Sequence, residues 1–382
     1  MKYSYLAILN PNFYPRPYFF LKCCGVPTYY LRTFIGYWKN PQKTLGGRVD
    51  TQRNTAASSG DLLRVVYNCP RQNRTLLLDS FIYELLYAPY ISKIRSNGVI
   101  VMNPHGVYAA KIAGKKAIVD LMDLWSCRLD ALQLNVFDFR MLRKADLILA
   151  WSKAIAALLR SIGLRRVEYL PYGIDLKDFD PLVVSPQIFL DKYKIDSAIV
   201  RIVYSGGMWK VSGKDVLGVE KLLRAFKRVE EKRRDVVLIL QTSGEVVELA
   251  KSVGIRSVVY VKRTQKPNDP LRLSMLRSAD VLVLTASKYP AVYLAERTTM
   301  FQFMSSGNAI LAEDTPGVRG VLRHGETAYL VPVDSSEKLA EGIIELIKDD
   351  ALRRYIGRKA RDLLEREYTW DVLGEKARRL LI

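Results

Sequence analysis

The chain is poor in cysteine and almost devoid of histidine. Its 382 residues include four cysteines, two of them adjacent at Cys23 and Cys24, and the only imidazoles are His105 and His324. Because no Cys-x-x-Cys pair occurs, neither a disulfide framework nor a zinc cluster is expected. These absences favour a reducing compartment and predict that no metal site is built from His or Cys.

Long apolar runs are missing as well. The start, MKYSYLAILNPNFYP, carries only a short apolar run before Asn10 and Pro11. No window of the sequence reaches the roughly 18 apolar residues that a membrane-spanning helix needs. We therefore expect neither a secretory signal nor a membrane span, which favours a cytoplasmic protein.

Acidic residues are scarce relative to basic ones. The chain has 59 Lys and Arg against 39 Asp and Glu, a formal net charge of +20, which attracts anionic partners. Residues 1–60 hold eight basic residues and one acid, Asp50, and the first 40 residues hold twelve aromatics. This mixture suits peripheral binding to an anionic surface such as the inner face of the cell membrane. A solvated basic surface is the alternative, and nucleic acid is disfavoured because no RNA-binding signature occurs.

The length and the apolar pattern predict two α/β domains. A chain of 382 residues exceeds the roughly 250–300 residues at which a single core stops growing. Short apolar runs alternate with helical patterns, which is typical of a doubly wound parallel sheet. The candidate strands are residues 5–10, 62–68, 75–79, 98–103, 117–123, 147–152 and 167–173 in the first half, and 198–205, 235–242, 257–262, 280–285, 308–313 and 328–333 in the second.

The expected organisation has four parts. Residues 1–185 form a first domain, 186–197 a linker that starts at Pro186, 198–365 a second domain, and 366–382 a helix that crosses back onto the first domain. In such folds ligands bind beyond the carboxyl ends of the strands.

Residues 299–333 carry the most informative local pattern. An apolar helical stripe that starts at Met300 is followed by a helix end at Gly307 and by a buried strand at residues 309–312. Gln302 then lies on the helix face that we expect to look into the ligand-binding cleft.

Several segments resemble a known enzyme family. Residues 143–181, RKADLILAWSKAIAALLRSIGLRRVEYLPYGIDLKDFDP, are similar to the end of the first domain of retaining GT-B glycosyltransferases of the family-four type, the glycosyl transferases group 1. In the second half the YSGG turn, GVEKLLRAF at 218–226, the Met-Ser-Ser-Gly helix end and HGETAYLV at 324–331 follow the order of that family. The resemblance runs from about residue 117 onward.

The resemblance implies a GT-B fold, in which two Rossmann-like doubly wound domains face a central cleft. It also implies a retaining hexosyltransferase that moves a sugar from a nucleotide-diphosphate donor to a lipid-linked or glycan acceptor. No cofactor, metal or protein nucleophile is implied. A positive helix terminus and lysines would stabilise the departing diphosphate, which would itself take the proton of the acceptor hydroxyl.

A glycine turn and two lysines are the candidates for binding the diphosphate. Gly206 and Gly207 follow a predicted strand, where the missing Cβ atoms let backbone N–H groups approach a phosphate. A plain tight turn is the alternative. Lys210 and Lys214 lie just beyond and would offset charge on the leaving group. The family has a lysine where this chain has Leu217, so Lys214 is a displaced substitute by hypothesis and a solvated lysine otherwise.

In the family, two glutamates bracket the donor, one at the sugar and one at the ribose hydroxyls. The second position falls on Gln302, whose amide still accepts a hydrogen bond but lacks the strength of a carboxylate. The first position falls two residues before Glu296, which is either the displaced catalytic carboxylate or a surface-loop residue. Thr298 and Thr299 precede the helix and would cap it beside the phosphates, and Met300 is assigned with them to donor binding.

The resemblance also assigns residues of the first domain to the cleft. Gly25 in CCGVPTYY matches a glycine that lies over the cleft, and Asp120 and Asp123 end a buried strand like the D-x-H-D segment of the family. Met122 replaces the histidine that contacts the donor sugar, so His105, at another strand end, is the remaining candidate for that contact. A structural histidine is the alternative.

Two other functions stay open, and the departures at Met122, Leu217 and Gln302 favour the first of them. One is a catalytically weakened GT-B protein that acts as a binding or partner subunit. The other is a GT-B sugar-nucleotide epimerase, which changes the configuration of a sugar without an acceptor. Fold-level analogy does not choose among the three functions.

Overall fold

The protein is described from a computed structural model. The structure describes residues 2–7, 16–33, 63–69, 84, 88–89, 91–124, 134, 136–211, 213–264 and 268–382. The chain divides into two compact units. Unit 1 comprises Met1–Leu170 and Gly374–Ile382, and unit 2 comprises Pro171–Leu373.

Unit 1 is built on a seven-stranded sheet in which every pairing is parallel. Its strand order is β3-β2-β1-β4-β5-β6-β7, so the order reverses between β1 and β4. The strands are β1 (Tyr3–Ala7), β2 (Thr28–Thr33), β3 (Leu63–Cys69), β4 (Gly98–Met102), β5 (Lys116–Leu121), β6 (Leu147–Ala150) and β7 (Val167–Tyr169). The helices whose bounds lie within the described residues are α1 (Arg16–Cys24), α5 (Val107–Ile112), α6 (Val136–Lys144) and α7 (Lys153–Ser161).

Unit 2 contains a six-stranded parallel sheet of order β12-β11-β8-β13-β14-β15, which reverses between β8 and β13. The strands are β8 (Val200–Ser205), β11 (Val236–Thr242), β12 (Val258–Lys262), β13 (Val281–Leu284), β14 (Ala309–Glu313) and β15 (Tyr329–Val331), and β9 (Lys210–Val211) pairs with β10 (Lys214–Asp215) in a separate hairpin. The described helices are η1 (Pro181–Val183), α8 (Gln187–Tyr193), α9 (Val219–Lys232), α10 (Gly244–Val253), α11 (Pro270–Ser278), α12 (Pro290–Tyr293), α13 (Thr298–Ser305), α14 (Pro316–Arg319), α15 (Ser336–Lys348) and α16 (Asp350–Glu367). Helix α17 (Trp370–Leu381) begins in this unit and ends in unit 1.

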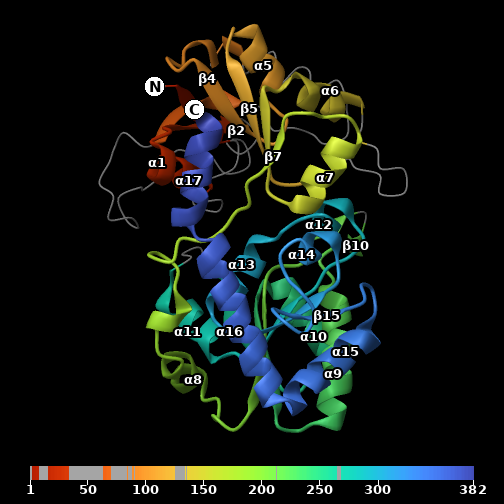
Figure 1. The fold of residues 1–382 in the computed structure, drawn as a ribbon. Helices are drawn as coiled ribbons and strands as arrows, with labels where there is room; N and C mark the ends of the chain where they lie inside the picture. Colours follow the sequence, from red (N-terminus) through yellow and green to blue (C-terminus); the bar gives the residue numbers. More distant parts are fainter. Residues whose placement is uncertain are drawn as a thin grey trace. The chain divides into compact units, whose positions relative to one another are not determined.

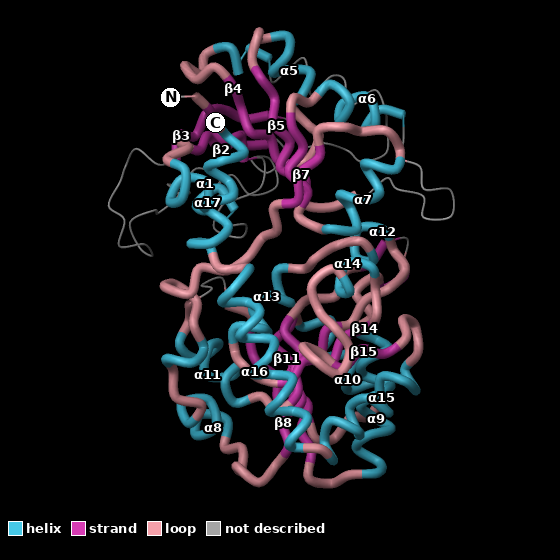
Figure 2. The backbone as a smooth tube through the Cα atoms, viewed as in Figure 1, coloured by secondary structure: helices cyan, strands magenta, loops and turns pink. Residues whose placement is uncertain are grey.

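Helices cover both faces of the second sheet. Figure 1 shows α9 and α15 on one side of it and α8, α11 and α16 on the other, and Figure 2 shows the strands in magenta between these layers. Ile202 and Tyr204 of β8 pack with Leu222 and Phe226 of α9, while Val203, which points to the opposite face, is also fully buried. Burial on both faces explains why these strands read as continuous apolar runs.

Most of the predicted strands are confirmed. Each predicted run of the second half contains one observed strand, and six of the seven runs in the first half overlap β1, β3, β4, β5, β6 or β7. The run at 75–79 lies outside the described residues. The sequence analysis missed β2 at residues 28–33, where the run TYYLRT contains polar residues and no clear alternation.

The boundary between the units lies earlier than predicted. Residues 171–197 belong to unit 2 and therefore form neither the end of the first domain nor a linker. The Phe189 N–H donates to the Ser274 hydroxyl at 2.9 Å, and the Arg361 guanidinium binds both carboxylate oxygens of Asp180 at 2.8 and 3.0 Å. At the other end of the chain only Gly374–Ile382 returns to unit 1, so the return occurs within α17 and not from residue 366.

A buried ion pair lies at the centre of unit 1. Arg16 of α1 and Asp120 of β5 are both fully buried, with Nη2 and Oδ1 3.2 Å apart. The Asp120 carboxylate also accepts hydrogen bonds from the Tyr5 hydroxyl at 2.8 Å and the Trp151 indole at 2.7 Å, and Arg16 donates to the Leu170 carbonyl at 2.9 Å. The pair therefore connects α1 to strands that are distant in sequence.

Among the described residues, no helix has both the length and the apolar content that crossing a bilayer requires.

The Arg16→Met variant tests the buried pair. Removing the guanidinium leaves the Asp120 carboxylate buried without its counter-charge, so we expect a loss of about 3–5 kcal/mol in the free energy of unfolding. Urea unfolding followed by circular dichroism measures the loss. Arg165→Met, the same substitution at an exposed position of unit 1, should change stability by no more than about 0.5 kcal/mol. Equal effects of the two substitutions would contradict the assigned role of Arg16.

Candidate functional site

The candidate site lies at the carboxyl edge of the second sheet, where the strand order reverses between β8 and β13. At such reversals the connections leave the sheet on opposite faces and open a crevice outside the strand ends. Gly206 and Gly207 come directly after β8, and the Gly206 N–H donates to the Gln241 carbonyl of β11 at 3.1 Å. The structure thus places the predicted glycine turn at the reversal.

Tyr204 and Arg297 hold the glycine turn in place. The Tyr204 hydroxyl donates to the Gly207 carbonyl at 2.9 Å, and burial raises the pKa of Tyr204 to about 12. A Cβ atom on Gly206 would lie 2.8 Å from that hydroxyl, so the turn needs glycine there. Arg297 donates to the Thr285 carbonyl beyond β13 and also hydrogen-bonds Tyr204. One guanidinium therefore joins the ends of β8 and β13 across the reversal.

A second glycine brings the loop before α9 against the end of β13. Gly218 has a φ of 78°, and a Cβ atom there would lie 2.8 Å from the Ala286 carbonyl oxygen. The Thr285 and Ser287 hydroxyls donate to the Leu217 and Val216 carbonyls at 2.6 and 2.7 Å. Both the left-handed backbone and the close approach explain why this position is glycine.

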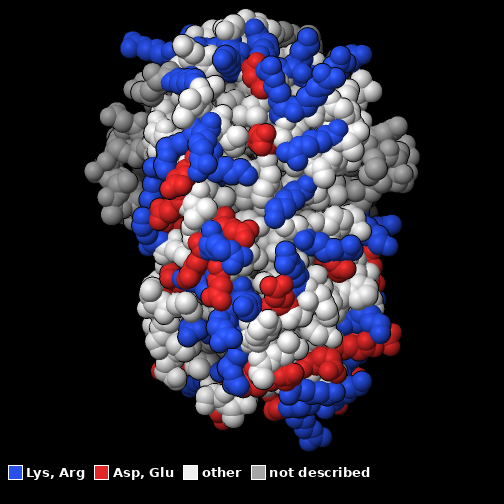
Figure 3. All heavy atoms as spheres, in the orientation of Figure 1, with Lys and Arg blue, Asp and Glu red and all other residues white. Residues whose placement is uncertain are grey.

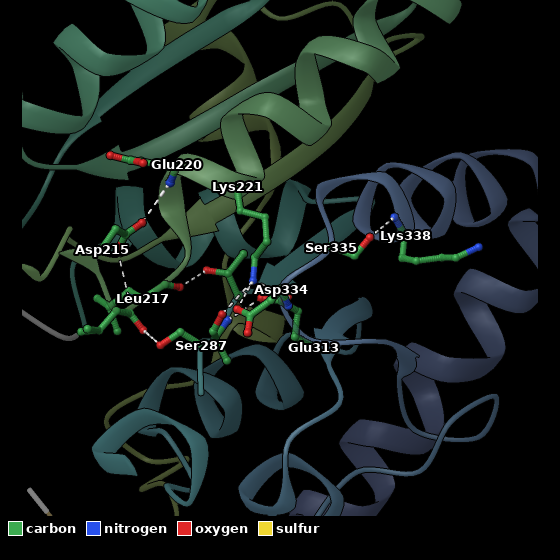
Figure 4. Close-up of polar contacts among 12 residues, drawn as sticks. Asp215, Leu217, Glu220, Lys221, Ser287, Glu313, Asp334, Ser335 and Lys338 are labelled. Carbon is green, nitrogen blue, oxygen red and sulfur yellow. Dashed lines mark hydrogen bonds and ion pairs between the residues drawn. The ribbon is translucent and has the colours of Figure 1, made fainter. Parts of the chain in front are cut away.

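Beside that loop, Lys221 of α9 and Glu313 of β14 form a buried ion pair, shown in Figure 4. The Lys221 Nζ and Glu313 Oε1 atoms are 2.5 Å apart, and Glu313 is fully buried. The carboxylate also accepts the Ala286 and Asp334 N–H groups at 2.7 and 2.9 Å. Burial raises the pKa of Glu313, while the Lys221 charge lowers it. This pair therefore connects α9 and β14 with the loops after β13 and β15 at the edge of the sheet.

A polar network lies on the other side of the glycine turn. Arg272, in the first turn of α11, donates from Nη2 to the Gln302 Oε1 atom at 2.6 Å and from Nε to the Gln241 Oε1 atom at 3.2 Å. The Ser205 hydroxyl donates to the same Gln241 oxygen at 2.8 Å. Burial and then the nearby charge of Arg263 lower the pKa of Arg272 to about 10. The network thus joins four elements, β8, β11, α11 and α13.

Gln302 lies in this network, but the residues at the start of its helix differ from the prediction. Thr298 and Thr299 lie inside α13, and its N-cap is Arg297, which makes no side-chain capping bond. The Met300 side chain is fully buried and its N–H donates to the Arg297 carbonyl at 2.9 Å. The assignment of Met300 to donor binding is therefore corrected, because its side chain belongs to the core.

Two of the predicted catalytic residues of unit 2, Lys210 and Lys214, lie on the paired strands β9 and β10. Lys210 forms an ion pair with Glu245 at 2.5 Å, and Lys214 is exposed on β10. Glu296 is buried, with 3% of its surface exposed, so it is not a surface-loop carboxylate. The catalytic roles of these three residues stay predictions.

The predicted residues of unit 1 lie at different places in its fold. His105 follows β4, where burial lowers its pKa and the Asp138 charge raises it, and Asp123 follows β5. Gly25 instead ends α1 with a φ of 65°, and its N–H donates to the Leu21 carbonyl at 2.9 Å. A helix between parallel strands runs back to the amino edge of the sheet, so Gly25 lies at the edge opposite the carboxyl end of β1. That assignment is corrected.

The assignment of Asp120 to the cleft is corrected as well, because this carboxylate is fully buried and paired with Arg16. Among the described residues, no group of three or more His, Cys, Asp or Glu side chains could hold a metal ion.

Sequence reasoning missed the cations that the fold brings to the carboxyl edge. Arg263 follows β12 directly, and Arg297 precedes α13 directly. Their positions at a strand end and a helix start could have been used to predict that they lie at this edge. Lys221 and Arg272 gave no signal, because basic residues are common on any helix.

Known proteins match this chain over the unit that carries the site. Residues 214–363 match the family model described as glycosyl transferases group 1. A phosphatidyl-myo-inositol mannosyltransferase of Mycobacterium tuberculosis is 31% identical over 170 residues, which are 43% of this chain and 43% of the relative. Both matches are similarities over less than half of this chain. The chain thus spans less than half the length of that curated relative.

Solved structures match over the whole chain. A glycosyltransferase from Rickettsia africae has a TM-score of 0.70 at 14% identity, with 100% of this chain and 98% of that chain covered. The Anabaena HepE structure in complex with UDP and glucose has a TM-score of 0.70 at 14% identity, with 100% and 99% covered. At such identities the likeness shows the fold alone, and the predicted GT-B fold is confirmed.

The Lys221→Met variant tests the buried pair in the site. The uncompensated Glu313 carboxylate should lower the free energy of unfolding by about 3–5 kcal/mol at pH 8. Without Lys221 the folded-state pKa of Glu313 rises further above its unfolded value, so the folded state takes up a proton as the pH falls and the loss should be smaller at pH 5. Thermal unfolding at both pH values measures this difference.

The matched control for this experiment is Lys338→Met. Lys338 pairs with Glu341 at 2.7 Å, but both side chains are about half exposed, at 53% and 52%. We expect a loss of at most about 1 kcal/mol and the same loss at both pH values. A Lys221→Met loss as small as that of the control would show that the pair does not hold the edge.

Proposed function

We propose that this protein is a glycosyltransferase that transfers a sugar from a nucleotide-diphosphate donor to a lipid-linked or glycan acceptor. The observation that carries the proposal is the carboxyl edge of the second sheet, where the turn of Gly206 and Gly207 meets Arg263, Arg272 and Arg297 at the strand-order reversal. A nucleoside diphosphate has the charge that such an edge attracts. The match of residues 214–363 to glycosyl transferases group 1 supports the same chemistry.

The reaction that suits these groups needs no protein nucleophile. Charge develops on the diphosphate as the bond to the sugar breaks, and fixed guanidinium groups and backbone N–H groups stabilise that charge in the transition state. The diphosphate oxygen then takes the proton of the acceptor hydroxyl on the same face of the sugar, which gives retention. Metal independence is part of the proposal, because the side-chain cations offer the electrostatic stabilisation that a divalent ion would otherwise provide.

The acceptor is proposed to be an anionic lipid or a lipid-linked glycan. Residues 1–170 hold 24 Lys and Arg against 10 Asp and Glu, and blue basic side chains are widely spread on the face drawn in Figure 3. The relative from Mycobacterium tuberculosis is named for a phosphatidyl-myo-inositol substrate, which supports a membrane-borne acceptor. Residues 34–60, which hold four of the eight basic residues of the first 60, lie outside the described residues.

Nucleotide binding is the first test of the proposal. Thermal unfolding is measured with UDP, GDP, ADP and their sugar conjugates, at low and at moderate salt. A ligand at about 100 times its dissociation constant stabilises the folded state by roughly 2.7 kcal/mol, and the proposal requires such a stabilisation to be selective for one base and to persist in salt. The selected donor is then incubated with acceptors, and NMR reads the anomeric configuration of the product.

Arg263→Gln and Arg256→Gln form the matched pair for this test. The Arg263 guanidinium lies 3.0 Å from the point where a Cβ atom on Gly207 would sit, so its loss should weaken diphosphate binding by about tenfold or more. Arg256 is exposed in the same unit and should leave binding unchanged. Altered sugar configuration without transfer would instead indicate an epimerase, and nucleotide binding without consumption of any donor would indicate a binding subunit.

Membrane association is tested by sedimentation with vesicles. We expect the protein to bind vesicles that contain anionic phospholipid and to be released as salt shortens the range of the attraction. Vesicles of phosphatidylcholine alone serve as the control. Binding that is absent, or equal for both vesicle types, would remove the membrane from the proposal and leave the basic surface to soluble partners.

A further inference from the structure

Two aliphatic side chains of unit 1 are exposed on neighbouring helices. Ile112, at the end of α5, has 60% of its surface exposed, and Val136, at the start of α6, has 64% exposed. The two helices are in contact, and the rings of Tyr108 and Phe137 meet edge to face with their centroids 6.2 Å apart. Ile112 and Val136 therefore lie on the outer side of one helix pair.

The other exposed residues of α6 are all basic. Counted from Val136, the residues Arg140, Arg143 and Lys144 follow at i+4, i+7 and i+8, which is one face of a helix. The acid of this helix, Asp138, is only half-buried but does not belong to that exposed stripe. The outer face of α6 thus combines an aliphatic start with three cations.

The fold uses the neighbouring lysines but not these three cations. Lys111 pairs with the Asp146 carboxylate at 2.6 Å, and Lys115 donates to two backbone carbonyls. Within the described part of the chain, none of the three cations of α6 makes a hydrogen bond or an ion pair. Figure 3 shows blue side chains close together over this part of unit 1. We call the exposed side chains of the helix pair and of the start of β5 the α5–α6 face: Ile112, Lys116, Val136, Arg140, Arg143 and Lys144.

This combination of side chains fits the surface of an anionic bilayer. Aliphatic side chains leave water when they enter the boundary between headgroups and acyl chains, and basic side chains around them meet the lipid phosphates. Nucleic acid attracts a protein mainly through charge, so it would not account for the exposed Ile112 and Val136. The α5–α6 face offers both interactions on one side of one unit.

We propose that the α5–α6 face docks on a membrane that contains anionic phospholipid, with Ile112 and Val136 inserted between the headgroups and the basic side chains at the phosphates. This inference rests on the membrane-borne acceptor of the proposed function and deepens it, because it names the surface that makes the contact. It assigns that contact to α5 and α6 and not to residues 1–60, whose composition first suggested a membrane.

The first variant, Arg140→Gln/Arg143→Gln/Lys144→Gln, removes three charges from the face. Sedimentation with vesicles of phosphatidylcholine and phosphatidylserine in equal parts gives the partition coefficient, which we expect to fall about tenfold or more. The control, Arg224→Gln/Arg228→Gln/Lys232→Gln, removes the same three charges from exposed positions of α9 in unit 2. It should change the partition coefficient by less than about twofold, because salt screens charges that are far from the membrane.

The second variant, Ile112→Ser/Val136→Ser, removes the apolar part of the face. We expect its partition coefficient to fall about tenfold or more, and the loss should remain at moderate salt because it is not electrostatic. The control, Val183→Ser/Ile188→Ser, removes the same two residue types from positions of unit 2 that are 79% and 48% exposed. It should bind the vesicles like the wild-type protein.

Three results overturn the proposal. Loss of binding in the charge variant alone, with Ile112→Ser/Val136→Ser unchanged, would make the face a site for nucleic acid or an acidic protein. Wild-type binding by both variants would place the membrane contact elsewhere, and equal losses in variants and controls would show that the face is not special. All substituted side chains are exposed, so thermal unfolding should match the wild-type protein; if one variant does not fold, the other still decides with its own control.

Failure of the proposed function gives a different result. If the wild-type protein transfers no sugar and binds no nucleotide but binds anionic vesicles, with both predicted losses, the α5–α6 face stands and the enzyme assignment falls. If the wild-type protein transfers sugar but does not bind the anionic vesicles, the face falls and the transferase stands.

Discussion

Parallel pairing of six strands, with β8 in the middle of their order, makes every strand of the second sheet end at one edge. Strand β8, the first of the unit, lies between β11 and β13. The connections on the β11 side of β8 and those on the β13 side therefore leave the sheet on opposite faces, and they diverge at that edge. Gly206, Thr285 and Glu313 are far apart in sequence, yet each lies at a strand end there. The site is a consequence of strand order, and the side chains only determine what the edge attracts.

Two kinds of cation lie at this edge. Lys221 is neutralised by the buried Glu313 carboxylate and connects α9 to β14, which is the behaviour of a structural pair. Arg272 and Arg297 donate to uncharged oxygens, those of two glutamine amides and of the Thr285 carbonyl. Guanidinium groups that the fold holds in a fixed orientation are preorganised, and preorganised positive charge is what stabilises developing charge on a leaving group.

Apolar runs were sufficient to predict most of the fold, because buried parallel strands such as β11 and β14 are apolar on both faces and end at clear turn residues. β2 was missed because TYYLRT has neither a continuous apolar run nor alternation. The glycine turn was also predictable, since a strand followed by two glycines marks a close approach. Asp120 was misassigned because sequence does not tell a carboxylate that faces a cleft from one that meets a buried arginine, here more than one hundred residues earlier.

The same distinction decides how the unusual residues of this chain are to be understood. The family has a glutamate at the position of Gln302, and judged by that pattern the missing carboxylate suggests a weakened site. Judged by its contacts, Gln302 is one of two amides that orient Arg272, and Gln241, which shares this role, is buried and also bound to Ser205. Gln302 therefore belongs to a hydrogen-bond network that joins β8, β11, α11 and α13, and this structural role is one that a comparison with the family pattern does not reveal.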